Sequence, residues 1–241
     1  YKRQFYALTG SSFSIYHEAL AFGTYRMLGV AGVQIIERTD DLPFDGTAYA
    51  TGDNITVYGD SYSAGGGGAV ATFPDIVRKN LFVTHRDLAA TVINNAVGGS
   101  SFSDQRNLAV GDAGSIDGTM LIWDGHANGR GTVANDIALL DDMVTAKGDD
   151  NWLLILSIPI AGEYTTAYVD WINDFKAAAE AAYGAIHIFD PRPTLQELDP
   201  GDTSIGGLPA SIFIDAAHIS AEAENAVAIP VAERLVTIRA L

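Results

Sequence analysis

The sequence predicts a three-layer α/β/α sandwich built around a mainly parallel, five-stranded sheet. Two observations indicate this fold: short β-rich segments alternate with helical patterns from about residue 54 onward, and several of these segments are nearly continuous apolar runs. Strands that are buried on both faces of a parallel sheet have this composition. The expected strands are 54–59, 90–97, 118–125, 151–160 and 185–191. Ligands of such sheets bind at the carboxyl ends of the strands, so the residues after each strand are the first candidates for a site.

Helical patterns fill the intervals between these strands. The segment 71–81 follows a glycine loop, and the segment 132–147 is long and amphipathic. In the segment 164–184, apolar residues recur at helical spacing, and Gly184 is a good C-terminal stop. A last helix is expected after Ser220, which is a good N-cap residue.

The first 50 residues do not follow this alternation. They are rich in aromatic residues and end in a turn-rich connector, DDLPFDGTAYATGD. Because so short a segment can bury little core, we expect residues 1–50 to form an N-terminal extension that packs on the main domain or on another subunit. The main domain is then residues 51–241. The extension is also the one indication of a homo-oligomer.

Composition argues against several classes of function. Of the 241 residues, 48% are hydrophobic and 18% are charged, as in globular proteins, and no apolar stretch approaches the length that spans a bilayer. The net charge of −16 argues against a nucleic acid or an anionic membrane surface as partner. The absence of cysteine excludes disulfides, a thiolate zinc site and a cysteine nucleophile. The chain begins at Tyr1 rather than Met and shows no signal segment, as expected of a processed or excised piece, so the compartment is left open. Between compartments, we slightly favour a secreted or extracytoplasmic location.

The segment ITVYGDSYSAGGGG, residues 55–68, fits either a phosphate-binding glycine loop or a serine nucleophile at the end of a strand. Residues 66–71 match a degenerate G-x-G-x-x-A pattern, but six residues separate them from the strand, whereas a dinucleotide fingerprint follows its strand directly. The acidic residue expected after the second strand is missing too, since Asp87 precedes that strand. These departures favour Ser61 as a nucleophile.

A serine nucleophile needs a base and a group that orients the base. Among the five histidines, His218 is the best candidate, because Asp215 precedes it by three residues, just before the last helix. A carboxylate at that spacing can meet the imidazole and fix its tautomer. His126 ends the third strand, at the edge of the sheet where a site is expected. His187 alternates with isoleucines and is expected to be a packed or edge histidine within a strand.

Two further segments end strands at the same edge of the sheet. NNAVGGSS (94–101) ends in a glycine pair, whose backbone N–H groups can point into a site. WDGHANG (123–129) carries Asn128, whose side-chain amide is a second candidate donor to an oxyanion. Glycine and asparagine are also ordinary turn residues after strands. A single site nevertheless requires Ser61, Gly99 and Asn128 to lie at one edge, and the expected elements place them there.

Together these segments resemble the SGNH (GDSL-type) hydrolase family over roughly residues 54–241, and no G-x-S-x-G elbow of an α/β-hydrolase occurs. The resemblance implies a flavodoxin-like fold. Gly-Asp-Ser matches the nucleophile block, which implies that Ser61 is the nucleophile and also an oxyanion donor. The second block of the family is matched by NNAVGG, residues 94–99, which implies Gly99, rather than Gly98, as the oxyanion glycine. The D-x-x-H block matches at Asp215 and His218.

The third block departs from the family pattern G-x-N-D. Here GHANG, residues 125–129, has one extra residue before the asparagine and a glycine where the family has aspartate. The resemblance still implies Asn128 as the third oxyanion donor. Tyr62, Trp123 and His126 either line the acyl pocket or pack in the core.

The particular residues within these motifs point to one branch of the family. The N-x-A-V-x-G second block, the glycines after Gly-Asp-Ser and the Gly-His pair before the asparagine are similar to rhamnogalacturonan acetylesterases and related carbohydrate deacetylases. This implies a serine esterase that removes small acyl groups, such as acetyl, from a saccharide through an acyl-enzyme, without metal or organic cofactor. The alternatives are a lipid esterase or acyl-thioesterase of the same family, and a non-catalytic carbohydrate-binding or structural module.

Overall fold

The chain divides into two compact units, Tyr1–Ala48 and Tyr49–Leu241. In the larger unit, the computed structural model describes residues 54–65, 71–85, 91–160 and 165–239. In the smaller unit it describes the backbone of four short strands, which pair antiparallel, β1 with β2 and β3 with β4: β1 (Arg3–Phe5), β2 (Ile15–His17), β3 (Arg26–Val30) and β4 (Val33–Glu37). The aromatic residues expected to define the extension fall largely outside the described residues, so the role of the extension stays a prediction.

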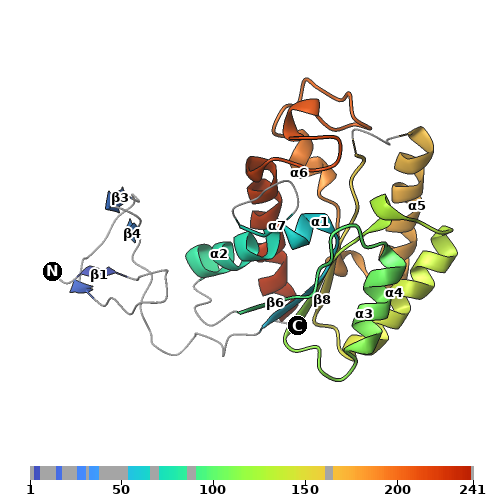
Figure 1. Ribbon diagram of the computed structural model, residues 1–241, viewed down its shortest axis with the longest axis horizontal. Helices are drawn as coiled ribbons and strands as arrows, with labels where there is room; N and C mark the ends of the chain where they lie inside the picture. Colours follow the sequence, from blue (N-terminus) through green and yellow to red (C-terminus); the bar gives the residue numbers. More distant parts are fainter. Residues whose placement is uncertain are drawn as a thin grey trace. The chain divides into compact units, whose positions relative to one another are not determined.

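Five parallel strands form the sheet of the larger unit, in the order β6–β5–β7–β8–β9 (Figure 1). The strands are β5 (Ile55–Tyr58), β6 (Val92–Asn94), β7 (Thr119–Trp123), β8 (Trp152–Ile155) and β9 (Ile188–Phe189). Numbered by their place in this unit, the strands run 2-1-3-4-5, which is the flavodoxin-like order. The strand order reverses between β5 and β7, so a ligand site is expected at their carboxyl ends.

Helices cover both faces of the sheet, as the sequence predicts. One layer contains α1 (Ser61–Ala64), α2 (Phe73–His85) and α7 (Ala221–Arg239), and the other contains α3 (Phe102–Gly111), α4 (Val133–Lys147) and α5 (Thr166–Tyr183) (Figure 1). A short helix, α6 (Arg192–Gln196), packs against α7. The predicted three-layer α/β/α sandwich is therefore confirmed.

Alternate residues of each strand enter two separate apolar cores. Strand residues on the α2–α7 face are Ile55, Val57, Leu121, Trp123, Leu153, Ile155 and Phe189. Strand residues on the α3–α4–α5 face are Tyr58, Met120, Ile122, Trp152, Leu154 and Ile188. Because both faces are covered, the strands are apolar at nearly every position, and this explains why their sequences lack the alternation of half-exposed strands.

All five predicted strands are longer than the observed ones, and three of them differ by five residues or more. Residues 90–97 form a strand only over β6, because the Asn94 side chain accepts the N–H of Ala96 at 3.1 Å and turns the chain. Residues 151–160 form β8 only as far as Ile155. Residues 185–187 form a 3₁₀ helix before β9, so His187 is not in a strand. It is a packed histidine, as expected, and stacks on Trp152 with ring centroids 4.6 Å apart.

The helix ends follow local capping chemistry. The hydroxyl of Ser220 accepts the N–H of Ala223 at 3.2 Å, which confirms the predicted N-cap of α7. The helix α3 was not expected, although Ser101 and Asp104 form a reciprocal capping box at its start. Within the described residues, no helix combines the length and apolar character needed to cross a membrane.

Candidate active site

Ser61 is the first residue of α1, directly after the carboxyl end of β5, and is half-buried. The side chain of Asp60 caps this turn, since its Oδ1 accepts the N–H of Tyr62 at 3.0 Å. Gly59 is needed for close approach, because a Cβ there would lie 2.6 Å from the hydroxyl of Ser63. The Gly-Asp-Ser sequence thus forms a tight strand-to-helix turn that holds Ser61 at the edge of the sheet. The glycine run 66–68 lies outside the described residues.

His218 and Asp215 form a direct pair in the loop before α7. Nδ1 of His218 lies 2.8 Å from Oδ2 of Asp215, and Oδ1 of Asp215 accepts the backbone N–H groups of Ala217 and His218, both at 2.7 Å. The backbone hydrogen bonds, followed by the contact with His218, lower the pKa of Asp215 to about 2. The carboxylate is therefore ionised at neutral pH, which places the imidazole proton on Nδ1 and leaves Nε2 free to act as a base.

Tyr62 connects the Ser61 turn with the His218 loop. Its hydroxyl donates to the carbonyl oxygen of Ala217, and its ring lies 6.0 Å from the ring of His218 between centroids. On its other side the ring stacks on Trp123 at 5.0 Å. Within the described residues, no hydrogen bond yet joins the Ser61 hydroxyl to His218; such contacts are often long in free enzymes and tighten with substrate.

Tyr62 and Trp123 are both buried, Trp123 completely, so the stacked pair forms a packed layer beneath the loop rather than an open surface. Their predicted role in an acyl pocket stays a prediction.

Gly99 lies in the turn that follows β6. The N–H of Val97 and the hydroxyl of Ser100 both donate to the carbonyl oxygen of Gly59 at 3.0 Å, which fixes this turn against the Ser61 turn. Gly99 has φ +77°, the left-handed region that favours glycine, although a Cβ there would meet nothing within 4 Å. Backbone conformation, rather than lack of space, therefore explains this glycine. Gly98 has no such conformational requirement.

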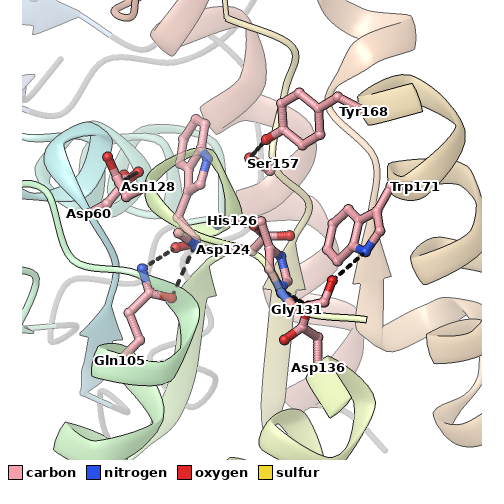
Figure 2. Close-up of polar contacts among 12 residues, drawn as sticks. Asp60, Gln105, Asp124, His126, Asn128, Gly131, Asp136, Ser157, Tyr168 and Trp171 are labelled. Atoms are coloured by element: carbon pink, nitrogen blue, oxygen red, sulfur yellow. Dashed lines mark hydrogen bonds and ion pairs between the residues drawn. The ribbon is translucent and has the colours of Figure 1, made fainter. Parts of the chain in front are cut away.

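Asn128 ends a 3₁₀ helix, η2 (His126–Asn128), which follows β7 and accommodates the extra residue of the third block. Its Nδ2 donates to Oδ2 of Asp60 at 2.9 Å and to the carbonyl oxygen of Ser100 at 3.2 Å. Figure 2 shows Asn128 beside Asp60. The structure thus brings the Ser61, Gly99 and Asn128 segments together. An oxyanion bound by Asn128 would replace one of the two present acceptors.

Asp60 is almost completely buried at the centre of these contacts, with 1% of its surface exposed. Burial raises its pKa to about 7, against the hydrogen bonds from the N–H of Tyr62 and the amide of Asn128. The nearby Asp124 raises it further. Asp60 therefore holds its proton up to nearly neutral pH.

Gln105 was not identified from the sequence. It is fully buried in α3, where its Nε2 donates to the carbonyl oxygen of Trp123 at 3.1 Å and its Oε1 accepts the N–H of Gly125 at 3.2 Å (Figure 2). A Cβ on Gly125 would lie 2.4 Å from the carbonyl oxygen of Ser100, so only glycine fits there. The capping box at Ser101 was the available signal for α3, but it does not show that Gln105 reaches the end of β7.

His126 is completely buried, and its ring lies between two carboxylates. Nδ1 is 2.7 Å from Oδ1 of Asp124, and Nε2 is 3.5 Å from Oδ2 of Asp136. Burial alone would lower the pKa of His126, but the two carboxylates raise it above its ordinary value. His126 thus lies in the interior, and its predicted role in a pocket has no direct support from this position.

Glu224 is a further buried acid, located in the first turns of α7. Its Oε2 has no hydrogen-bond partner, and 5% of its surface is exposed. Burial raises its pKa to about 7, while the nearby His218 acts in the opposite direction. In the described part of the chain, no group of three or more histidine, aspartate or glutamate side chains is arranged to hold a metal ion.

Comparison with known proteins finds no matching family model and no matching curated protein. Solved structures do match. An acetylxylan esterase, Axe2, from Geobacillus stearothermophilus has a TM-score of 0.57 at 16% identity, and the match covers 78% of this chain and 95% of that one. LAE5, an α/β hydrolase enzyme from the metagenome of Lake Arreo in Spain, has a TM-score of 0.59 at 15% identity, covering 79% and 98%. A protein from Desulfitobacterium hafniense, assigned to the G-D-S-L family of lipolytic proteins, has a TM-score of 0.54 at 17% identity, covering 75% and 98%.

These matches extend over nearly the whole length of the compared proteins, and at this level of identity they establish the fold. The finer resemblance to rhamnogalacturonan acetylesterases stays a prediction. Neither the described residues nor the compared structures support the homo-oligomer expected through the N-terminal extension. The described part of the larger unit therefore has the fold of the G-D-S-L (SGNH) esterases, as the resemblance in the sequence implied.

Proposed function

We propose that this protein is a serine esterase that hydrolyses small acyl esters, acetyl esters of a saccharide in particular. One observation carries the proposal: an ionised Asp215 holds Nδ1 of His218, in a loop that Tyr62 ties to the turn bearing Ser61. A serine at the end of a strand, together with a histidine–aspartate pair, is the set of groups that acyl transfer to serine requires.

The reaction begins when Nε2 of His218 accepts the proton of the Ser61 hydroxyl and Oγ attacks the ester carbonyl carbon. The N–H groups of Ser61 and Gly99 and the amide of Asn128 stabilise the resulting oxyanion. The C–O bond to the alcohol then breaks, and His218 returns its proton to the leaving alkoxide. Water, deprotonated by His218, attacks the acyl-enzyme in the same way and releases the acid. Every step uses groups of this chain and water.

Two observations support an acylated saccharide as substrate. The fold is shared with acetylxylan esterases, and two structures of the Geobacillus enzyme are catalytic mutants in which a serine or an aspartate is replaced by alanine. Those are the residue types of the nucleophile and of the orienting acid proposed here. In addition, the net charge of −16 suits a neutral saccharide better than a polyanion.

The proposal is tested by hydrolysis of p-nitrophenyl acetate, followed by acetate release from acetylated xylo-oligosaccharides. Ser61→Ala is expected to abolish both activities. Ser63→Ala is the matched control, because its hydroxyl lies two residues away but is buried without a hydrogen-bond partner. Absence of hydrolysis by the unaltered protein, or equal hydrolysis by Ser61→Ala, would refute the proposal.

Two exposed apolar side chains favour a lipid esterase or acyl-thioesterase as the second candidate. Val97 and Ile214 are 51% and 54% exposed, and they adjoin the Gly99 turn and Asp215. A long acyl chain needs exposed apolar side chains to contact, whereas an acetyl group does not. Hydrolysis rates that rise from acetate to octanoate would favour this function, and rates that fall would favour the saccharide acetylesterase.

A further inference from the structure

The proposed reaction leaves one buried ionisable cluster without a role. Asp124 and His126 lie at the start of the turn that carries Asn128, and Asp136 lies close to His126; the three are called here the His126 cluster (Figure 2). The exposed fractions of the three residues are 1%, 0% and 3%. Buried charges are costly unless they are paired, so a cluster of this kind calls for an explanation.

The geometry indicates that His126 is an imidazolium. Each ring nitrogen faces a carboxylate oxygen, Nδ1 at 2.7 Å from Asp124 and Nε2 at 3.5 Å from Asp136. Neither contact has hydrogen-bond geometry, so the attraction is one of charge. An imidazolium lies within ion-pair distance of both carboxylates, whereas a neutral ring would leave them facing no positive charge.

Aromatic rings enclose the rest of His126. The ring centroids of Phe102, Trp171 and Phe175 lie 4.3, 4.3 and 4.8 Å from that of His126. From α3 and α5 the histidine therefore meets uncharged rings, and the two carboxylates, from the end of β7 and from α4, are the charged groups that face it in the described part of the chain. Without the imidazolium, two buried carboxylates would lack a counter-charge.

The same two carboxylates hold both ends of the Asn128 turn, residues 125–131. At its start, Oδ1 of Asp124 accepts the backbone N–H of His126 at 2.9 Å. At its end, Oδ2 of Asp136 accepts the N–H of Gly131 at 2.9 Å, and the indole of Trp171 donates to the carbonyl oxygen of Gly131 at 3.2 Å. The His126 ring thus links the acceptor at one end of the turn to the acceptor at the other.

We propose that His126 is a positioning residue, whose imidazolium joins the two carboxylates that hold the Asn128 turn and so fixes the Asn128 amide beside Ser61. This inference rests on the proposed esterase function. The side-chain amide of Asn128 donates to Asp60 and to the carbonyl oxygen of Ser100. A shift of the turn would displace the amide from both acceptors and from a developing oxyanion, while the binding of substrate would change little.

A double-mutant cycle with His126→Gln and Asn128→Ala tests this role, using p-nitrophenyl acetate. His126→Gln is expected to lower kcat about 10- to 100-fold with KM within threefold, and to lower it less than threefold when Asn128 is already alanine. A purely structural role would instead multiply the two effects or raise KM, and either result would overturn the inference. Loss of hydrolysis in Ser61→Ala, measured in parallel, establishes that the esterase reaction itself is the one observed.

His187→Gln is the matched control, since His187 is also buried and stacked on an aromatic ring but precedes β9, at the opposite end of the sheet. It is expected to leave kcat unchanged. If His126→Gln does not fold, Asp136→Asn replaces it, because an asparagine oxygen still accepts the N–H of Gly131 while the charge is lost. It is expected to lower kcat and to be non-additive with Asn128→Ala.

NMR of the His126 imidazole in the unaltered protein measures its protonation state and gives an independent test. The inference requires the His126 ring to be protonated at pH 7. A neutral ring at that pH would overturn it.

Discussion

Two histidine–aspartate arrangements lie near the same edge of the sheet, and they differ in exposure. In the first, His218 and Asp215 lie in a surface loop, with 23% and 49% of their side chains exposed. In the second, His126 lies between Asp124 and Asp136 and is completely buried. In the proposed roles, the same types of side chain serve chemistry in one place and hold a turn in the other, and the exposed arrangement is the one that a substrate can reach.

The two arrangements also stabilise their charges differently. Asp215 is stabilised chiefly by two backbone N–H groups, so most of the stabilisation of its charge does not come from His218. The charges of the His126 cluster depend on one another, because the surrounding rings exclude water. We therefore expect changes to the first pair to affect catalysis with little loss of stability, and changes to the second to lower stability as well as to displace the Asn128 turn.

The largest effect is expected from His218→Ala. Loss of the base should lower kcat for p-nitrophenyl acetate on the order of 10⁴-fold, with the free energy of unfolding changed by less than about 1 kcal/mol. Steady-state kinetics and urea unfolding measure the two quantities. Activity within tenfold of the unaltered protein would show that another group accepts the Ser61 proton.

Asp215→Asn should follow, with kcat lowered on the order of 10³-fold. The asparagine oxygen can still accept the N–H groups of Ala217 and His218, so the loop is kept while the charge that fixes the tautomer of His218 is lost. An unchanged melting temperature would confirm that the loop persists. Full activity would mean that the carboxylate has no part in orienting the base.

His126→Ala is expected to change stability most, by about 3 kcal/mol or more in urea unfolding at pH 7, because it leaves two buried carboxylates without a counter-charge. His187→Ala removes another buried histidine, which has no carboxylate partner among the described residues, so it provides the reference. Equal losses for the two variants would mean that packing, rather than charge, explains the contribution of His126.

The smallest effect concerns Glu224, the buried acid near His218. Its pKa is about 7 in the folded protein against an ordinary value of 4.5, so the folded state holds a proton that the unfolded state releases. Stability from this group is therefore greatest below about pH 4.5 and declines as pH rises to about 7. Asp60 acts in the same direction.

Glu224→Gln should flatten this decline by about 1 kcal/mol between pH 5 and pH 8, measured by urea unfolding across that range. A pH dependence identical to that of the unaltered protein would show that Glu224 is ionised in the fold.

The sequence predicted the architecture because its helical and apolar patterns repeat strongly. The layers, the parallel sheet and the start of α7 at Ser220 all follow from such patterns. The helix α3 was missed because few of its residues are apolar, and only Phe102, Gln105 and Ala109 are buried. Strand ends were misjudged where a local turn, such as that of Asn94, ends a run whose residue types still favour a strand.

Candidate site residues could be predicted where a motif is local, as for Asp215 and His218, whose contact spans three residues. The contacts of Gln105 and Asp136 could not, because they depend on where α3 and α4 dock after the sheet has formed. The burial of residues near strand ends could not be predicted from the sequence either, because a residue just after a strand can face either the interior or solvent. Tyr62 and His126 face the interior.

Covalent labelling of Ser61 tests the central claim most directly. Incubation with a fluorophosphonate, followed by mass spectrometry of peptides, should show one adduct per chain, on the peptide that contains Ser61, and His218→Ala should suppress it. Labelling of another residue, or no adduct at Ser61 in a preparation that hydrolyses p-nitrophenyl acetate, would contradict the assignment of Ser61 as the nucleophile.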